Sequence, residues 1–200
     1  MLRRSIALAL TLAAALVAGD ARALGPVDLE VAAKAGLGTD PLGNGNPNPL
    51  GFGIGGRAGL SFFRFYGGVA LMYYFGASQN ESFGDVPSLS VSEHALMYGV
   101  EAGYNWYFLD KTLTIRPQLG VGNLTISSSV GALPQGVNPL PNSVSNLYLE
   151  PGVTALIALG QWFVGADGNL LVLPSIQEPG ATSSSTDVAF TVHAQVGLKF

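Results

Sequence analysis

The chain has 200 residues, enough for one domain, and no cysteine, which excludes disulfides, thiolate metal sites and a lipid-anchored N-terminal cysteine. Only 11% of its residues are charged, against roughly 25% in typical soluble domains, and its formal net charge of -4 argues against a nucleic-acid partner, which needs a basic face. The mean hydropathy is +0.37 and no apolar run after residue 23 is long enough for a spanning helix, which predicts a membrane protein built of strands.

The N-terminal segment has the three parts of a secretory signal peptide. Arg3 and Arg4 give a positive start, Ile6 to Ala18 forms a short apolar core, and Ala21-Arg22-Ala23 is a small-x-small cleavage site. We expect cleavage after Ala23, which leaves 24–200 as the mature domain. The alternative, an uncleaved membrane anchor, fits less well because the apolar core is short and a cleavage site follows it.

Eight stretches of the mature chain alternate between apolar and polar residues, as half-buried strands do. In chain order they are 28–37, 52–62, a third that follows Phe63–Phe65 and ends at Gly76, 94–108, 113–126, 147–159, 162–173 and 187–200.

Long and short connections alternate strictly between these stretches. The long ones are rich in Gly, Asn, Ser and Pro and cover 38–51, 77–93, 127–146 and 174–186. The short ones lie near Phe63–Phe65, at Asp110-Lys111 and at Gly160-Gln161, the last a two-residue hairpin turn. We therefore expect an all-β fold, an eight-stranded antiparallel up-and-down transmembrane β-barrel with long external loops and tight periplasmic turns. Together with export, this predicts a bacterial outer-membrane protein.

The size of the side chains predicts which face of each strand is outside. The interior of an eight-stranded barrel is only wide enough for side chains to fill. One face is bulky and apolar at nearly every position, whereas the other is mostly Gly, Ala, Ser and Thr with a few charges, so we expect the bulky face to contact lipid. Aromatic residues gather at both ends of the strands and predict two interfacial girdles made of Phe52, Phe62, Phe65, Tyr73, Phe75, Tyr98, Trp106, Phe108 and Trp162.

The last strand carries the most specific pattern. Even-numbered positions from Val188 to Phe200 are apolar or small and the odd-numbered positions are mostly polar. The chain resembles the small eight-stranded outer-membrane barrels of the OmpA-transmembrane, OmpX and opacity-protein type, whose terminal strand is an assembly signal. His193, Leu198 and Phe200 fit that signal, while Gln195 stands where glycine is usual.

The resemblance implies several partners. It implies that the barrel assembly machinery reads Phe200 and the terminal strand. We further expect a monomer surrounded by outer-membrane lipid and lipopolysaccharide. The absence of a periplasmic peptidoglycan-binding domain after Phe200 argues against the tethering role of longer relatives.

The polar face predicts a charge network inside the barrel. Unpaired charges in a narrow lumen are costly, so we expect salt bridges, with Arg57 and Arg116 as forked donors to Glu101 and Glu150. This network is interpreted as a structural plug; the functional alternative is a gated or water-filled conduit. Its members are Glu30, Lys34, Arg57, Glu101, Arg116, Glu150, Asp167, His193 and Lys199.

No catalytic or metal site is predicted. His193 as a base would need a nucleophile and an orienting carboxylate, and no such signature is evident; no zinc-type spacing joins it to His94. The long loops carry acidic residues and no Lys or Arg, so divalent cations could bridge them, although solvated loop charges are the simpler interpretation. These carboxylates are Asp40, Glu81, Asp85, Glu93, Glu178 and Asp187.

Pro117 and Pro151 lie inside expected strands, where each removes a ladder donor. They predict either bulges or a lateral opening from the lumen to the bilayer. The main functional prediction is a non-enzymatic barrel with a plugged lumen that acts as an envelope structural or surface-interaction protein. The alternatives are a narrow channel for small or hydrophobic solutes, as in OmpW-like barrels, and, more remotely, a lipid-modifying enzyme.

Overall fold

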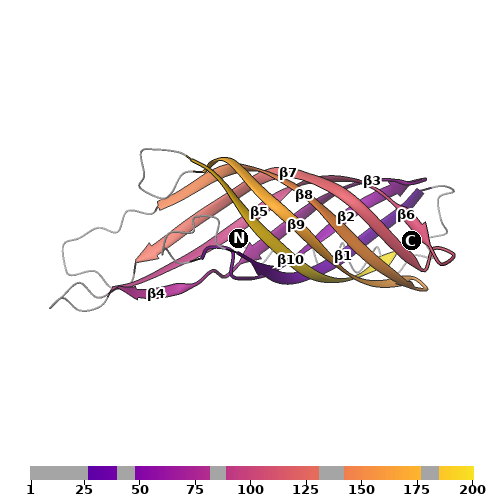
Figure 1. The fold of residues 1–200 in the computed structure, drawn as a ribbon. Helices are drawn as coiled ribbons and strands as arrows, with labels where there is room; N and C mark the ends of the chain where they lie inside the picture. The colour runs from indigo at the N-terminus through magenta and orange to yellow at the C-terminus, as the bar shows by residue number, and fades with distance from the viewer. Residues whose placement is uncertain (1–26, 40–47, 82–88, 131–141, 177–184) are drawn as a thin grey trace, which may run out of the picture.

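The structure is a computed structural model that describes residues 27–39, 48–81, 89–130, 142–176 and 185–200. The predicted signal peptide, residues 1–23, lies outside these ranges. Among the described residues, no helix is long and apolar enough to cross a membrane. All regular structure in the described part is β-strand (Figure 1).

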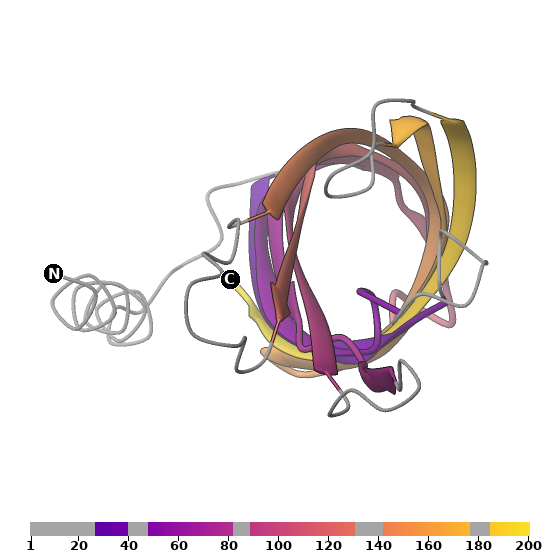
Figure 2. The same ribbon diagram turned by 90° about the vertical axis from the view of Figure 1, so that its left-hand side faces the viewer.

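Ten strand segments close into a barrel with eight strand positions around its circumference, each of which we call a stave. The segments β3 and β4 both pair with β5, and β5 and β6 both pair with β7, so each of these two pairs forms one interrupted stave. All neighbours are antiparallel, and the β5–β7 and β1–β10 pairings complete the ring that Figure 2 shows end-on. The segments are β1 Val27–Gly38, β2 Phe52–Phe62, β3 Phe65–Tyr74, β4 Ser78–Glu81, β5 Leu89–Tyr104, β6 Trp106–Phe108, β7 Leu113–Val130, β8 Asn142–Leu159, β9 Trp162–Ile176 and β10 Ser185–Lys199.

The expected eight-stranded up-and-down barrel is confirmed, but several strands are longer than predicted. β5 begins at Leu89, β7 continues to Val130 and β8 begins at Asn142, all inside segments predicted as loops, and β4 lies inside the expected loop 77–93. The Ser- and Asn-rich ends of β7 and β8 stay in register, from Thr125 opposite Ser145 to Ser128 opposite Asn142. These ends carry no apolar outer face, so alternation of hydropathy could not reveal them.

Three tight connections make one end of the barrel, which we call the turn end. Phe63 and Arg64 join β2 to β3 with Phe63 at φ 56°, and Leu109, Asp110 and Lys111 all have positive φ between β6 and β7. The predicted Gly160-Gln161 hairpin turn is confirmed, and Gly160 has φ 74°, a conformation that glycine adopts without strain. The long connections meet at the opposite end, which we call the loop end.

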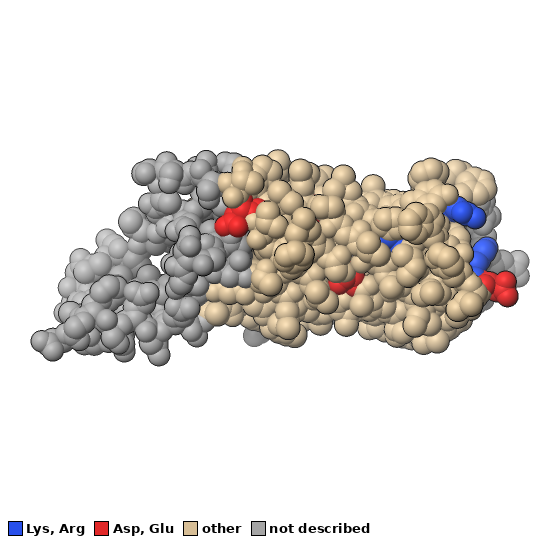
Figure 3. Space-filling view, viewed as in Figure 1, with Lys and Arg blue, Asp and Glu red and all other residues tan. Residues whose placement is uncertain are grey.

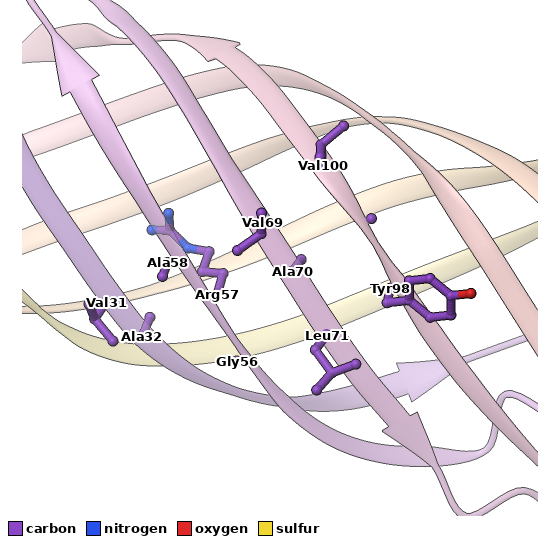
Figure 4. A pocket seen from close by; sticks show the side chains of 11 residues that line it. Val31, Ala32, Gly56, Arg57, Ala58, Val69, Ala70, Leu71, Tyr98 and Val100 are labelled. Atoms are coloured by element: carbon purple, nitrogen blue, oxygen red, sulfur yellow. The ribbon is translucent and has the colours of Figure 1, made fainter. Parts of the chain in front are cut away.

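The outer wall is apolar. All nine aromatic residues assigned to the girdles are on it and are between 39% and 66% exposed. Charged atoms are rare on the barrel surface seen in Figure 3, where most of the blue atoms lie at the right-hand, turn end. Small residues such as Gly56 and Ala58 leave a shallow hollow of about 640 Å³ between the larger side chains of β1, β2, β3 and β5 (Figure 4).

Each proline coincides with an interruption on one side of its strand. The β5–β7 ladder ends at Gly103 opposite Gln118 and resumes as β6–β7 at Trp106 opposite Ile115, so Pro117 lies in the gap. The β8–β9 pairs likewise pass from Leu149 to Gly152, with Pro151 between them. The β7–β8 ladder runs through both prolines without a break.

Candidate functional site

The lumen is filled by side chains, and their chemistry changes along the barrel axis. Eight of the nine residues predicted for the lumen network are buried; Lys199 is the exception. The expectation of a mostly small inner face is wrong, because large side chains also point inward. They include Tyr66, Met72, Tyr74, Met97, Tyr148 and Phe163, each at most 3% exposed.

Glu30 organises the charged cluster nearest the turn end. Its Oε1 accepts a hydrogen bond from Arg116 Nη2 at 2.7 Å, and its Oε2 accepts one from Arg57 Nη2 at 3.1 Å. Ser61 Oγ donates a further bond to Oε1 at 3.3 Å. The Arg116 guanidinium also lies 3.8 Å from the centre of the Tyr66 ring, a cation–π contact. One carboxylate therefore binds two buried guanidinium groups, both of which also contact the Tyr66 ring.

The predicted pairing of these arginines with Glu101 and Glu150 is wrong. Both arginines contact Glu30 instead: Arg57 does so from β2, the neighbour of β1, and Arg116 does so across the lumen from β7. Glu150 accepts a hydrogen bond from Thr191 Oγ1 at 3.2 Å, and Glu101 Oε2 has no hydrogen-bond partner among the described residues. No ion pair in the described part involves either glutamate.

Asp167 organises a second cluster nearer the middle of the barrel. Its Oδ1 contacts His193 Nδ1 at 2.7 Å and accepts a bond from Asn169 Nδ2 at 2.8 Å. Its Oδ2 contacts Lys34 Nζ at 3.1 Å. The opposite ring nitrogen of His193 lies 2.7 Å from the Tyr74 hydroxyl. Asp167 is therefore satisfied from three neighbouring strands, β1, β9 and β10.

His193 does have the orienting carboxylate that a catalytic base needs, but it is sealed inside the barrel. Its side chain and that of Asp167 are each 0% exposed. Its other partner is a phenol, and the backbone is packed so closely that a Cβ added at Gly36 would come within 2.6 Å of the His193 ring. This arrangement is that of a satisfied core histidine rather than an accessible base.

Gln195 joins the two clusters, and sequence reasoning missed this role. Its Oε1 accepts a bond from Arg57 Nε at 2.7 Å, and its Nε2 donates to Asp167 Oδ2 at 3.2 Å. This is the position where the resemblance leads one to expect glycine. The presence of Gln195 instead of glycine was the one signal of this role in the sequence, since a long side-chain amide in the lumen needs hydrogen-bond partners for both its oxygen and its nitrogen.

The loop end of the lumen is closed by an apolar cluster, which we call the cap. Leu50 enters it from the segment before β2, where Leu50 N donates to Asn48 Oδ1 at 2.9 Å and the Leu50 carbonyl accepts from Gly38 N at 2.6 Å. Each side chain of the cap is at most 2% exposed. The cap consists of Leu50, Met72, Tyr74, Ala95, Met97, Leu124, Ile126, Tyr148, Leu171, Leu173 and Ala189.

The predicted loop carboxylates do not come together in the part of the chain that is described. Glu93 is buried and accepts from Ser128 Oγ at 3.0 Å, and Asp187 is half-buried and accepts from Val188 N. Asp40, Asp85 and Glu178 lie outside the described residues, as does the side chain of Glu81. No group of three or more His, Asp or Glu side chains in the described ranges could hold a metal ion.

The residues assigned to the assembly signal lie along the β10 edge that closes the barrel. His193 points into the lumen, while Leu198 pairs with Val31 on one side and Trp162 on the other. Phe200 exchanges two backbone hydrogen bonds with Leu29, at 3.0 and 2.9 Å. The terminal strand is therefore paired to its last residue.

Comparison with known proteins finds likeness in structure alone. No family model and no curated protein matches the sequence. A major outer-membrane protein of Thermus thermophilus superposes with a TM-score of 0.58 at 13% identity, covering 87% of this chain and 99% of that one. Neisserial surface protein A superposes with a TM-score of 0.55 at 13% identity, covering 88% and 98%.

A third structure, the attachment invasion locus protein of Yersinia pestis in complex with a heparin analogue, has a TM-score of 0.50 at 12% identity and covers 87% of this chain and 97% of that one. These proteins are small outer-membrane β-barrels, and the described strands of this chain close into an eight-stranded antiparallel barrel that superposes on them. The chain therefore has the fold of the small eight-stranded outer-membrane β-barrels.

Proposed function

We propose that the chain is an outer-membrane barrel with a closed lumen that acts as an envelope structural or surface-interaction protein. The wall supports the membrane assignment. Large apolar side chains from every stave are exposed on it, from Leu37 at 60% in β1 to Phe190 at 61% in β10. A contiguous apolar surface of this extent is typical of contact with lipid.

The filling of the lumen is the observation that carries the non-conducting assignment. The Glu30 cluster, the Asp167 cluster and the cap follow one another along the axis, and their central side chains are buried. An ion crossing the barrel would have to displace charge-assisted hydrogen bonds and then packed Leu, Met and Tyr side chains. The interior is therefore a core that stabilises the barrel, and interactions with other molecules fall to its outer surface and its two ends.

Conductance across a planar bilayer tests this proposal. The mature barrel, inserted from detergent and shown to be folded by protease protection, should give no steady current steps. A barrel in which Tyr74→Ala and Tyr148→Ala are combined removes two rings from the cap and serves as the matched, partly opened control. Reproducible unit steps from the wild-type protein would contradict a closed lumen.

The ladder interruptions beside Pro117 and Pro151 favour a second candidate function, the lateral passage of an apolar solute between neighbouring strands. Pro117 and Pro151 face outward and lie two residues apart in height, since Pro117 is opposite Val153 and Leu119 is opposite Pro151. The ladders on the outer flanks of β7 and β8 are therefore interrupted at levels only two residues apart. Uptake of a hydrophobic dye into vesicles tests this candidate, because a barrel without a lateral opening does not accelerate uptake over empty vesicles.

We assign no catalytic role. The geometry of His193 supports this assignment, because its two ring nitrogens are already engaged by Asp167 and Tyr74. Lipid A analysis of cells with and without the protein tests the assignment, and a modification that depends on the protein and on His193 would contradict it.

A further inference from the structure

The cations of the chain are distributed unevenly. Of its nine Lys and Arg residues, three precede Ala23 and three, Lys34, Arg57 and Arg116, are buried in the lumen. The remaining three all line one pocket at the turn end. These are Arg64, Lys111 and Lys199.

This pocket, which we call the turn-end pocket, has a volume of about 620 Å³ and two kinds of wall. Its polar side carries the three cations and Asp28. The rest of its lining is aromatic: the rings of Phe65 and Tyr104 meet edge to face with centroids 5.4 Å apart, and Phe63 and Tyr107 complete the lining.

Positive charge in the pocket is only partly neutralised. Lys199 Nζ lies 2.9 Å from Asp28 Oδ2, and both side chains are about one-third exposed. Within the described ranges, neither Arg64 nor Lys111 has a carboxylate at salt-bridge distance. Lys111 Nζ and Lys199 Nζ nevertheless lie 5.9 and 5.8 Å from the centre of the same Tyr107 ring. Two ammonium groups held around one ring repel each other, so an anion that contacts both lowers the electrostatic free energy.

The backbone holds this arrangement at a local cost. Phe63 and Lys111 both have positive φ, 56° and 69°, which is uncommon for bulky residues and is found where surrounding structure imposes it. Tyr107 ties one of these turns to the other, because its hydroxyl donates to the Phe63 carbonyl at 3.2 Å. The pocket is therefore built by two turns and the ends of the barrel strands rather than by chance contacts of long side chains.

We propose that the turn-end pocket binds the phosphate-bearing headgroup of an anionic glycerophospholipid from the membrane leaflet at this end of the barrel. The phosphate contacts Arg64, Lys111 and Lys199, and the glycerol and upper acyl carbons lie against Phe63 and Phe65. An amphiphile fits both walls, whereas a free inorganic anion uses only one. This inference rests on the proposed insertion into a membrane and adds a defined lipid site to it.

The test measures lipid bound to the refolded mature barrel by native mass spectrometry, after extraction from bilayers that contain phosphatidylcholine and phosphatidylglycerol. We expect wild-type protein to retain phosphatidylglycerol preferentially. Neutralising Arg64→Gln and Lys111→Gln together should reduce the preference roughly 20- to 30-fold, because a cation near a membrane surface contributes a factor of about five. The charge-conserving pair Arg64→Lys and Lys111→Arg should keep most of it.

A third variant separates the pocket from net charge. Asp187→Lys at the loop end, added to the two Gln substitutions, restores the net charge of the protein without restoring the pocket, and it should not restore the preference. Equal retention of both lipids by wild-type protein, or a preference that returns with Asp187→Lys, would overturn the site. So would complete displacement by free glycerol phosphate, which lacks the acyl part. Failure of the barrel to insert at all would instead refute the proposed function, so the two failures are distinguishable.

Discussion

The two ends of the lumen are closed in different ways. Toward the turn end, Glu30 and Asp167 each gather several charged or polar donors from neighbouring strands. Toward the loop end, the cap uses Leu, Ile, Met and Tyr side chains and has no ion pair in the described residues. A buried ion pair gains little over a well-packed apolar pair, yet leaving one charge alone is costly. The charged half is thus expected to be sensitive to loss of one partner, and the cap to loss of volume.

The largest effect should come from Glu30→Gln. This change is nearly isosteric but leaves Arg57 and Arg116 without their shared carboxylate, so the free energy of unfolding should fall by about 3–5 kcal/mol. Denaturant titration in lipid vesicles measures it. Asp187→Asn at the half-buried loop-end rim is the control and should change stability little, because Asp187 has no ion pair among the described residues. If both variants unfold at the same denaturant concentration as wild type, the Glu30 cluster is not a stabilising centre.

The cap is tested by paired truncations on β7. Leu124→Ala removes a side chain that is 0% exposed and should cost about 2–4 kcal/mol, since the surrounding structure closes a cavity only partly. Leu119→Ala, on the same strand but 53% exposed on the outer wall, should cost less, about 1 kcal/mol. Denaturant titration of both variants gives the comparison, and a larger loss for Leu119→Ala would reverse the assignment of faces.

The link between the two clusters is tested by Gln195→Gly, the substitution that restores the residue usual in similar barrels. It removes bonds to Arg57 and Asp167, and because hydrogen bonds to charged groups are worth about 1.5–3 kcal/mol, we expect a loss of roughly 2–3 kcal/mol. Ala194→Gly on the outward-facing neighbour controls for backbone entropy at about 0.5–1 kcal/mol. If Gln195→Gly and Ala194→Gly lower the free energy of unfolding equally, in thermal or denaturant unfolding, the hydrogen bonds of Gln195 do not stabilise the barrel.

The smallest effect is expected from Tyr74→Phe, which deletes only the hydroxyl that contacts His193. One net hydrogen bond corresponds to about 1 kcal/mol. The adjacent Tyr73 is on the outer wall and 39% exposed, so Tyr73→Phe is a matched control that should be close to neutral. Differential scanning of the two variants in the same detergent measures the contrast.

The outer wall and topology could be predicted from sequence because lipid imposes one simple rule on every outward residue. Period-two alternation and the Gly160-Gln161 turn were sufficient to place all eight staves. The interior follows no such rule. Which cation meets which carboxylate depends on register between strands distant in sequence, so Arg116 pairs with Glu30 across 86 residues rather than with Glu101 or Glu150.

The cap was missed for a related reason. Leu124 and Ile126 are inward residues in a strand whose outward neighbours there, Asn123 and Thr125, are polar, so the apolar face changes sides along β7. Leu50 was assigned to a polar loop by composition, and only the tertiary structure brings it into the lumen. Alternation of hydropathy shows that one face of a strand is apolar. It does not show whether that face points outward or into the lumen.

Oxygen accessibility along β10 tests the central claim most directly. The chain has no cysteine, so single cysteines from Val188 to Val196 can each carry a nitroxide without background labelling. In bilayers, even-numbered sites should collide often with lipid-dissolved oxygen, whereas odd-numbered sites should be shielded from both oxygen and a water-soluble nickel chelate. Odd-numbered sites open to the nickel chelate would show a wet conduit, and loss of the period-two alternation would show that the apolar face does not look into lipid.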